Sequence, residues 1–291
     1  MATPVTGSGA VSSIVSELEA LITTQPVDEV FISLPIDKYG SIIETLVQIC
    51  QDQGIVVRVH ADLSARSTIR PYLGELNGVP LVTVRSVPRD GWSILIKRLI
   101  DILASGGLLL LLTPFLALVA ILIKLDSPGA ILFRQERVGL NKRRFELLKF
   151  RTMVDGADLL QQTMEHLNEV PGPVFKIRND PRLTHLGTYL RRFSIDELPQ
   201  LVNVIKGDMS LVGPRPLPVR DVDRINVQWH KRRFSVKPGV TGLWQVNGRS
   251  DVNFDRWVQM DLEYIDHWSL GLDLKILAKT VPVVLAGSGS Y

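Results

Sequence analysis

The sequence contains only one cysteine, Cys50, in 291 residues. Disulfide frameworks need paired cysteines and cysteine zinc clusters need several, so both kinds of site are excluded. Charged residues make up only 22% of the chain against 45% apolar residues, which excludes an intrinsically disordered protein. A large excess of one charge is also missing. The 33 basic and 30 acidic residues leave a net charge of +3, which does not by itself indicate a nucleic-acid partner.

A long apolar run lies well inside the chain. No charged side chain occurs from Ile102 to Ile123. As a helix this run would extend about 33 Å, enough to cross the hydrocarbon core of a bilayer. Its distance from the N-terminus excludes a signal peptide. The run therefore predicts a membrane segment, with a buried core helix as the alternative.

Thr113 and Pro114 interrupt this run near its middle. Proline removes an N–H and clashes with the preceding turn, and the hydroxyl of Thr113 can bond a carbonyl that is left free. Each half then reaches only about half the thickness of the bilayer core. Basic residues flank both ends, so the positive-inside bias keeps both ends on the cytoplasmic face. These features favour a re-entrant hairpin over a spanning helix. The flanking basic residues are Lys97, Arg98, Lys124, Arg134, Arg137 and Lys142–Arg144.

The part of the chain before this run alternates between strand and helix patterns. Residues 27–35 and 55–61 predict strands, and residues 39–53 between them carry apolar residues at helical spacing. Residues 80–86 are a third candidate strand. This pattern predicts a small parallel sheet in the style of nucleotide-binding domains. The turn after the first strand lacks G-x-G-x-x-G, so we expect no bound dinucleotide and favour a regulatory or packing role.

The segment at residues 272–287 is apolar and helix-like. It fits a helix in the membrane interface, with Trp257 and Trp268 nearby, and it fits a core helix equally well.

The residues with most chemical potential lie between positions 178 and 216. Asp196 and Glu197 form a carboxylate pair there, shortly after Arg191. One interpretation is structural: Ser194 to Glu197 matches an S-x-x-E capping box, and a helix starting at Asp196 keeps Pro199 in the tolerated first turn. The other interpretation is catalytic, and it depends on the neighbouring arginines.

Arg215 lies between two prolines in the sequence GPRP at residues 213–216. The prolines stiffen the backbone, and a guanidinium group matches phosphate oxygens with two parallel bonds. Carboxylates among fixed arginines suit phosphoryl transfer, because a carboxylate can attack phosphorus or hold Mg²⁺ while the arginines neutralise charge. The neighbouring membrane segment suggests a lipid phosphate as one reactant. A solvated arginine in a surface turn is the alternative for Arg215.

Several motifs occur in a fixed order within residues 94–286. They are KRLIDI with the interrupted apolar run, FRQERVG, KFRTM, RRFSIDELPQLVNVIKGDMSLVGPRP, KPGVTGLWQVNGR and LDLKIL. Together they closely resemble the bacterial sugar transferases, the monotopic phosphoglycosyl transferases that make undecaprenyl-diphosphate sugars. The resemblance implies a re-entrant membrane helix. Thr113-Pro114 stands where this family usually has Ser-Pro, and the exchange keeps the hydroxyl.

The resemblance also implies a mechanism and a set of site residues. Asp196 would be the nucleophile on the β-phosphate of a UDP-sugar, releasing UMP, and undecaprenyl phosphate would then take the sugar phosphate from Asp196. Glu197 would complete the dyad, and Asp273 matches a further carboxylate needed for activity. Mg²⁺ is expected, with Asp196 as its protein ligand. The expected phosphate- and substrate-binding residues are Arg191, Arg215 and Arg249.

The expected fold class is α/β: a small Rossmann-like N-terminal domain, a re-entrant membrane helix hairpin and an α-rich (α+β) catalytic domain. The expected parts are a disordered leader (residues 1–12), a partial Rossmann-like domain (13–90), the re-entrant membrane helix (91–126) and the catalytic sugar-phosphate transferase domain (127–291). Larger members of the family carry a four-helix membrane bundle that is absent here, and the sequence does not decide between a natural short form and a cut chain. Larger members also tend to pair, which is consistent with a homodimer.

The expected function is that of an undecaprenyl-phosphate sugar phosphotransferase of EC 2.7.8 type, on the cytoplasmic face of the bacterial inner membrane. Its product would start exopolysaccharide, capsule or O-antigen synthesis. Glucose and galactose are the first choices for the sugar, and acetamido sugars stay open. One alternative is a non-catalytic membrane scaffold or regulator, which predicts no UMP release. A glycosyltransferase that moves the sugar alone would release UDP. A nucleic-acid binder is disfavoured by the interrupted apolar run, and we expect no nucleic-acid partner.

Overall fold

The computed structural model describes residues 8–60, 72–76, 79–84, 91–169, 172–175, 177, 180–248 and 252–287. The chain divides into two compact units. The first comprises Met1–Pro88, Asn141–Arg143 and Val227–Ser235, and the second comprises Arg89–Leu140, Arg144–Asn226 and Val236–Tyr291. Of the expected leader, residues 1–7 lie outside the described residues, and residues 8–12 belong to the first helix, α1 (Ser8–Thr24).

The first unit is built on a four-stranded sheet in the order β1-β2-β4-β3. Its elements after α1 are β1 (Glu29–Ile32), α2 (Ile36–Asp52), β2 (Val56–His60), β3 (Tyr72–Leu76) and β4 (Val79–Val84). The predicted strand, helix and strand are confirmed, and β1 and β2 are parallel. Ile43, Leu46 and Cys50 of α2 are buried with Val57 and Val59 of β2 in one core.

The prediction of a parallel sheet is wrong for the third predicted strand. β4 pairs antiparallel with β2, and β3 is an additional strand that pairs antiparallel with β4. Only two residues separate β3 from β4, and so short a connection permits antiparallel pairing alone, whereas parallel strands need a crossover of a dozen residues or more. The sheet of this unit is therefore mixed.

The second unit begins with the long helix α3 (Gly91–Asp126), which has Pro114 inside it. The helix is 36 residues long and apolar enough to cross a membrane, and only 11% of its most apolar window is buried. Leu110 is 79% exposed and Leu111 is 76% exposed, so a buried core helix is excluded. One side of its later part does pack inward, since Val119 and Ile123 are buried against Phe150 and Leu190.

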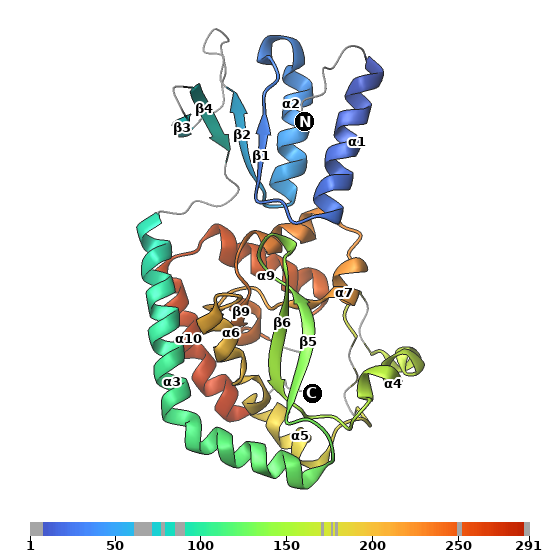
Figure 1. Ribbon diagram of the computed structural model, residues 1–291, viewed down its shortest axis with the longest axis vertical. Coiled ribbons are helices and arrows are strands. Elements are labelled where there is room, and N and C mark those ends of the chain that lie inside the picture. Colours follow the sequence, from blue (N-terminus) through green and yellow to red (C-terminus); the bar gives the residue numbers. More distant parts are fainter. Residues whose placement is uncertain are drawn as a thin grey trace. The chain divides into compact units, whose positions relative to one another are not determined.

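The ribbon of α3 is sharply bent (Figure 1). Pro114 cannot donate to the carbonyl of Leu110, and a proline within a helix is a common cause of such bends. The predicted hydroxyl bond of Thr113 is present, but its acceptor is the carbonyl of Leu109, 2.7 Å away, and not that of Leu110. Such a bond from Thr to the carbonyl four residues earlier itself favours bending. The interruption therefore bends one continuous helix without dividing it.

The rest of the second unit mixes small sheets with short helices. β5 (Leu132–Val138) pairs antiparallel with β6 (Arg144–Phe150) and with β8 (Leu217–Pro218), and β7 (Ser210–Val212) pairs parallel with β9 (Gly239–Thr241). The α-helices are α4 (Ala157–Thr163), α5 (His185–Arg192), α6 (Gln200–Lys206), α7 (Val219–Asp223), α8 (Leu243–Val246), α9 (Phe254–Asp266) and α10 (Leu270–Ala286). The described residues of the two units also include the 3-10 helices η1 (Leu140–Lys142), η2 (Glu165–Leu167), η3 (Ile195–Glu197) and η4 (Gln228–Ser235). The predicted mixture of helices and strands is thus confirmed.

Helix α10 covers the predicted apolar segment and shows both expected characters. Asp273 and Ile276 are buried on one side, whereas Leu274, Val281 and Leu285 are exposed. Trp257 is buried and stacks on Trp244, with ring centroids 4.2 Å apart. For Trp257 the structure therefore favours a place in the core over the alternative of the membrane interface.

The paired strands β7 and β9 hold the GPRP segment. The N–H of Gly213 donates to the carbonyl of Thr241 at 3.0 Å, and the N–H of Gly239 donates to that of Pro214 at 2.9 Å. A Cβ atom at Gly213 would lie 2.5 Å from the carbonyl oxygen of Lys237, so only glycine fits there. This close approach fixes the backbone that leads into Arg215.

Candidate active site

The Asp196–Glu197 pair lies on η3, between α5 and α6. The preceding Ser194 has φ 53°, in the left-handed region, and its side chain makes no capping bond. Helix α6 begins at Gln200 after Pro199. The prediction of a helix starting at Asp196 behind an S-x-x-E capping box is therefore wrong. The carboxylate of Glu197 bonds instead to two cations, and hydrogen bonds between charged groups are stronger than a backbone cap.

Glu197 is held between a lysine and an arginine. Lys149 Nζ donates to Glu197 Oε1 at 2.8 Å. Arg215 donates through Nη2 to Oε1 at 2.5 Å and through Nη1 to Oε2 at 3.3 Å. Burial alone would raise the pKa of Glu197, but Arg215 and Lys149 hold it well below its usual range. Glu197 is thus ionised, and both its oxygens are in use.

Asp196, next to it, is in a different state. Among the described residues no hydrogen bond reaches its carboxylate, and its ion-pair partner is Lys149 Nζ, 3.7 Å from Oδ2. The side chain keeps 8% of its surface exposed, so it is not sealed. Burial raises the pKa of Asp196, and Lys149 only partly opposes this. The result is a basic carboxylate that is free to take a new partner.

Four cations gather around these two carboxylates. Lys149 and Arg137 come from one face of the β5–β6 hairpin, Arg191 comes from the last turn of α5, and Arg215 follows β7. Arg137 Nη1 donates to the carbonyl of Pro216 at 2.9 Å, and burial together with the nearby Arg215 lowers its pKa to about 10. Burial likewise lowers the pKa of Lys149 and that of Arg191. Buried cations in excess over carboxylates repel one another, and an incoming anion such as a diphosphate would relieve that repulsion.

The structure brings together four of the predicted site residues. Asp196, Glu197, Arg191 and Arg215 interact with one another, and Arg191 is further held by a 3.0 Å bond from its Nε to Thr152 Oγ1. The interpretation of Arg215 as a solvated surface residue is wrong, because its guanidinium binds Glu197 with two bonds.

The other two predicted residues do not join this group. Arg249 lies outside the described residues. Asp273 is buried on α10, where it accepts bonds from Lys97 Nζ at 2.5 Å, Tyr264 Oη at 2.8 Å and Trp268 Nε1 at 3.2 Å. No hydrogen bond or ion pair in the described part of the chain links Asp273 to the dyad.

Two cations of this site were missed at the level of sequence, Lys149 and Arg137. A signal for Lys149 exists, because it lies two residues after Leu147, and residues two apart in a strand share a face. Leu147 is buried, which places the lysine on the inward face of β6. No comparable local signal marks Arg137.

The residues present fit a Mg²⁺ ion in a limited way. In the parts of the chain that the structure describes, no group of three or more His, Cys, Asp or Glu side chains gathers as a metal site. Glu197 is already bound by two cations, which leaves Asp196. Mg²⁺ commonly binds through one or two carboxylates together with substrate phosphates and waters. A carboxylate without a hydrogen bond from the described residues, close to lysine and arginine side chains, is compatible with that mode.

Residues 92–287 match the sequence pattern of the family described as bacterial sugar transferase. This chain belongs to that family, and the family expected from its motifs is confirmed. The carboxylate pair on η3 lies within the matched region, as does most of the apolar helix α3.

Several curated proteins are similar to this chain. Galactosyl transferase CpsE of Streptococcus agalactiae serotype III (strain NEM316) is 37% identical over 278 residues, covering 94% of this chain and 61% of CpsE. The exopolysaccharide production protein ExoY of Rhizobium meliloti (strain 1021) is 41% identical over 199 residues, covering 67% of this chain and 88% of ExoY. The UDP-glucose:undecaprenyl-phosphate glucose-1-phosphate transferase of Escherichia coli (strain K12) is 37% identical over 249 residues, covering 83% of this chain. The chain spans 61% of the length of CpsE and 51% of that of the E. coli protein.

Proposed function

We propose that this protein transfers a hexose-1-phosphate from a UDP-sugar to undecaprenyl phosphate, releasing UMP. The observation that carries the proposal is the Asp196 carboxylate, which has no hydrogen bond from the described residues and lies near three cations, Lys149, Arg191 and Arg215. The names of similar proteins support UDP-glucose or UDP-galactose as donor and a lipid carrier as acceptor. The reaction is a phosphotransfer of EC 2.7.8 type that starts exopolysaccharide, capsule or O-antigen synthesis.

In the first step Asp196 attacks the β-phosphorus of the UDP-sugar. A bond forms between a carboxylate oxygen and this phosphorus, the bond to the bridging oxygen breaks, and UMP leaves with that oxygen. The raised pKa of Asp196 makes its ionised form more nucleophilic. Lys149, Arg191 and Arg215 neutralise the charge that spreads over the phosphate oxygens. Glu197 keeps two of these cations in place by its bonds to Lys149 and Arg215.

In the second step a phosphate oxygen of undecaprenyl phosphate attacks the same phosphorus. The bond to Asp196 breaks, the carboxylate is restored, and the product is undecaprenyl-diphosphate-sugar. The same cations serve this step, because charge develops at the same phosphorus. Asp196 would also hold Mg²⁺, which when bound neutralises part of the diphosphate charge.

The membrane arrangement belongs to the same proposal. Helix α3 is apolar and bent, and basic residues flank both of its ends. A re-entrant hairpin with both ends on the cytoplasmic face of the bacterial inner membrane would place the site beside the lipid phosphate. The N-terminal β1–α2–β2 unit is proposed to be part of a Rossmann-like domain, and the functional form is proposed to be a homodimer.

A product assay tests this function. Protein in nanodiscs with Mg²⁺ and undecaprenyl phosphate is offered UDP-glucose, UDP-galactose and acetamido UDP-sugars, and UMP and UDP are measured. We expect UMP release with at least one donor, and loss of release in Asp196→Asn. The exposed Asp223→Asn serves as a matched control with unchanged release. UDP as the product would indicate transfer of the sugar alone, and no nucleotide product with any donor would indicate a scaffold.

A further inference from the structure

One polar turn of α3 contacts the segment that connects the dyad to Arg215. This polar turn is defined by Lys97, Arg98 and Asp101, and it directly precedes the uncharged apolar run that begins at Ile102. Asp101 is only 4% exposed, whereas Leu95 and Leu99 on the same helix are 59% and 57% exposed. This part of the helix thus directs Asp101 inward and the apolar Leu95 and Leu99 outward. Burial of charged groups is unfavourable unless they are bonded, so their partners are informative.

The partners of the polar turn lie at two places in one short segment. Arg98 donates to the carbonyls of Val204 at 2.6 Å and Ile205 at 2.8 Å, at the C-terminal end of α6. An arginine at this end satisfies carbonyls that lack partners within the helix. Gly207, which ends α6 with φ 98°, leaves room for it, since a Cβ there would lie 3.3 Å from Arg98 Nη2.

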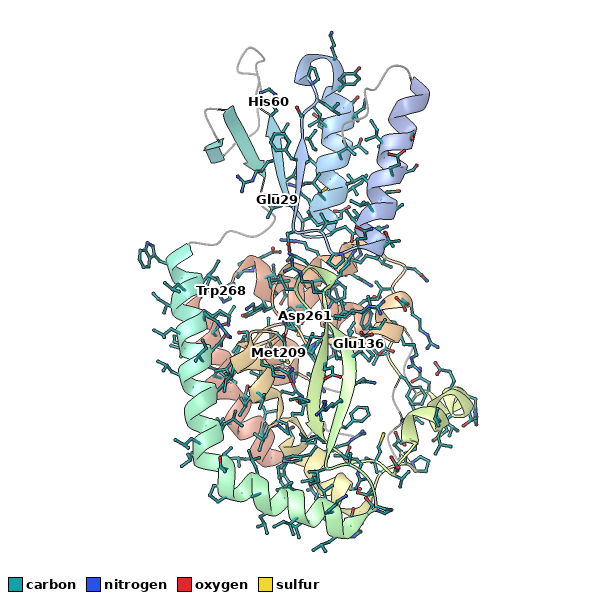
Figure 2. The ribbon with its side chains drawn as sticks, viewed as in Figure 1. Glu29, His60, Glu136, Met209, Asp261 and Trp268 are labelled. Carbon is teal, nitrogen blue, oxygen red and sulfur yellow. The ribbon has the colours of Figure 1, made fainter. Side chains whose placement is uncertain are left out.

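The same turn holds β7. Asp101 Oδ1 accepts a bond from the N–H of Leu211 at 3.1 Å, and Lys97 Nζ donates to the carbonyl of Val212 at 3.2 Å. Lys97 is itself bound by Asp273 at 2.5 Å. Met209, labelled in Figure 2 and fully buried, lies between these two points of attachment along the chain.

The α6–β7 segment that the polar turn holds follows the dyad in sequence and precedes Arg215. Glu197 lies three residues before α6, and Arg215 lies three residues after Val212. Their bidentate ion pair closes the segment into a loop. The cavity lined by Lys97, Asp101 and Asp273 has a volume of about 10 Å³, which leaves room for one water and not for a substrate.

We propose that Lys97, Arg98 and Asp101 are positioning residues, which fix the α6–β7 segment and thereby the placement of Arg215 against Glu197 and Asp196. Asp273 belongs to this group, since it orients Lys97 and does not bond to the dyad. This inference rests on the proposed function and adds a direct link from the membrane helix to the phosphate-binding residues. A shift of about 1 Å in a catalytic group can reduce the rate about 100-fold.

The test compares two substitutions of Asp101 that differ in one hydrogen bond. Asp101→Asn keeps an oxygen that accepts the N–H of Leu211, whereas Asp101→Leu removes it. We expect Asp101→Leu to lower kcat for UMP release at least tenfold with KM for the UDP-sugar changed less than threefold. We expect Asp101→Asn to keep kcat within threefold of wild type. Equal losses in both variants, or unchanged kcat in Asp101→Leu, would overturn the proposal.

A second measurement does not depend on activity. Hydrogen exchange of the peptide covering residues 208–217 is expected to be faster in Asp101→Leu and unchanged in Asp101→Asn. If wild type releases no UMP, the proposed function fails, and this comparison still decides the positioning role. Arg98→Met, expected to lower kcat at least tenfold, replaces Asp101→Leu if the latter has no cooperative melting transition.

Lys124→Met is the control for a role in lipid attraction. Lys124 lies near the other end of α3 and donates to the carbonyl of Gly129, away from the α6–β7 segment. We expect Lys97→Met to lower kcat while its flotation with anionic vesicles equals that of Lys124→Met, and Lys124→Met to keep wild-type kcat. If Lys97→Met only weakened vesicle binding and kept its kcat, the positioning role would be refuted.

Discussion

Replacement of the proposed nucleophile should make the protein more stable and inactive. Asp196 is a buried carboxylate without a hydrogen bond from the described residues, and burial raises its pKa. A raised pKa means that the folded state disfavours the ionised form, so ionised Asp196 lowers the free energy of unfolding. Asp196→Asn has nearly the same shape and no charge. We expect it to raise the free energy of unfolding by about 1 kcal/mol at pH 7.5, a gain typical of replacing an unfavourable group at a functional site.

The sign can be checked by varying pH. A group whose pKa is higher in the folded state favours folding below its unfolded pKa, and this contribution is lost as pH rises through the folded pKa. The stability advantage of Asp196→Asn should therefore vanish below about pH 3.9, where the carboxyl is protonated in both states, and grow as pH rises. For a chain of this size, 1 kcal/mol corresponds to a rise in Tm of about 3 °C.

The assay is thermal unfolding in one detergent across pH 4 to 8, alongside UMP release. Asp223→Asn, at an exposed position, should leave both Tm and release unchanged. A fall in Tm of Asp196→Asn at pH 7.5 would mean that the carboxylate is chiefly a structural partner of Lys149, and the argument for a free nucleophile would fail. UMP release by Asp196→Asn at the wild-type rate would equally refute the proposal that Asp196 is the nucleophile.

Three further substitutions probe the surroundings. Glu197→Gln leaves Arg215 and Lys149 without their shared anion, and we expect a loss of about 3 kcal/mol in unfolding free energy, measured by denaturant titration. As pH falls below about 4.3, the wild type should lose more stability than Glu197→Gln does, because the pKa of Glu197 is depressed in the folded state. Lys149→Met removes a cation that lowers the pKa of Asp196, so the acidic limb of the pH–rate profile for UMP release should move to higher pH. An unmoved limb would contradict the proposal that ionised Asp196 is the nucleophile. Pro114→Ala restores the N–H donor to the Leu110 carbonyl, and we expect a straighter α3 that spans the bilayer. Cysteines introduced before and after the helix should then be labelled from opposite sides of the membrane. Labelling from the same side would show that the bend does not depend on proline.

Several structural elements could be predicted from local patterns. The β1–α2–β2 unit follows from apolar runs and helical spacing, and α3 follows from the absence of charge between Ile102 and Ile123. The direction of β4 and the start of α6 could not be predicted in this way. The direction of β4 depends on β3, a neighbouring strand that was not predicted. The start of α6 depends on Glu197, whose carboxylate binds cations far away in sequence instead of capping its own helix.

The family was determined by sequence, because its motifs are contiguous around Asp196 and in the apolar run. Only the tertiary structure decided which side chains surround that carboxylate. Lys149 reaches Glu197 from 48 residues away in sequence, and Lys97 reaches Asp273 from 176 residues away. Such contacts arise when strands and helices pack, and no local spacing encodes them. The polar turn before the apolar run is a further example. The sequence indicated only that its basic residues flank a membrane segment, whereas in the structure Lys97 and Arg98 bond to the backbone that leads to Arg215.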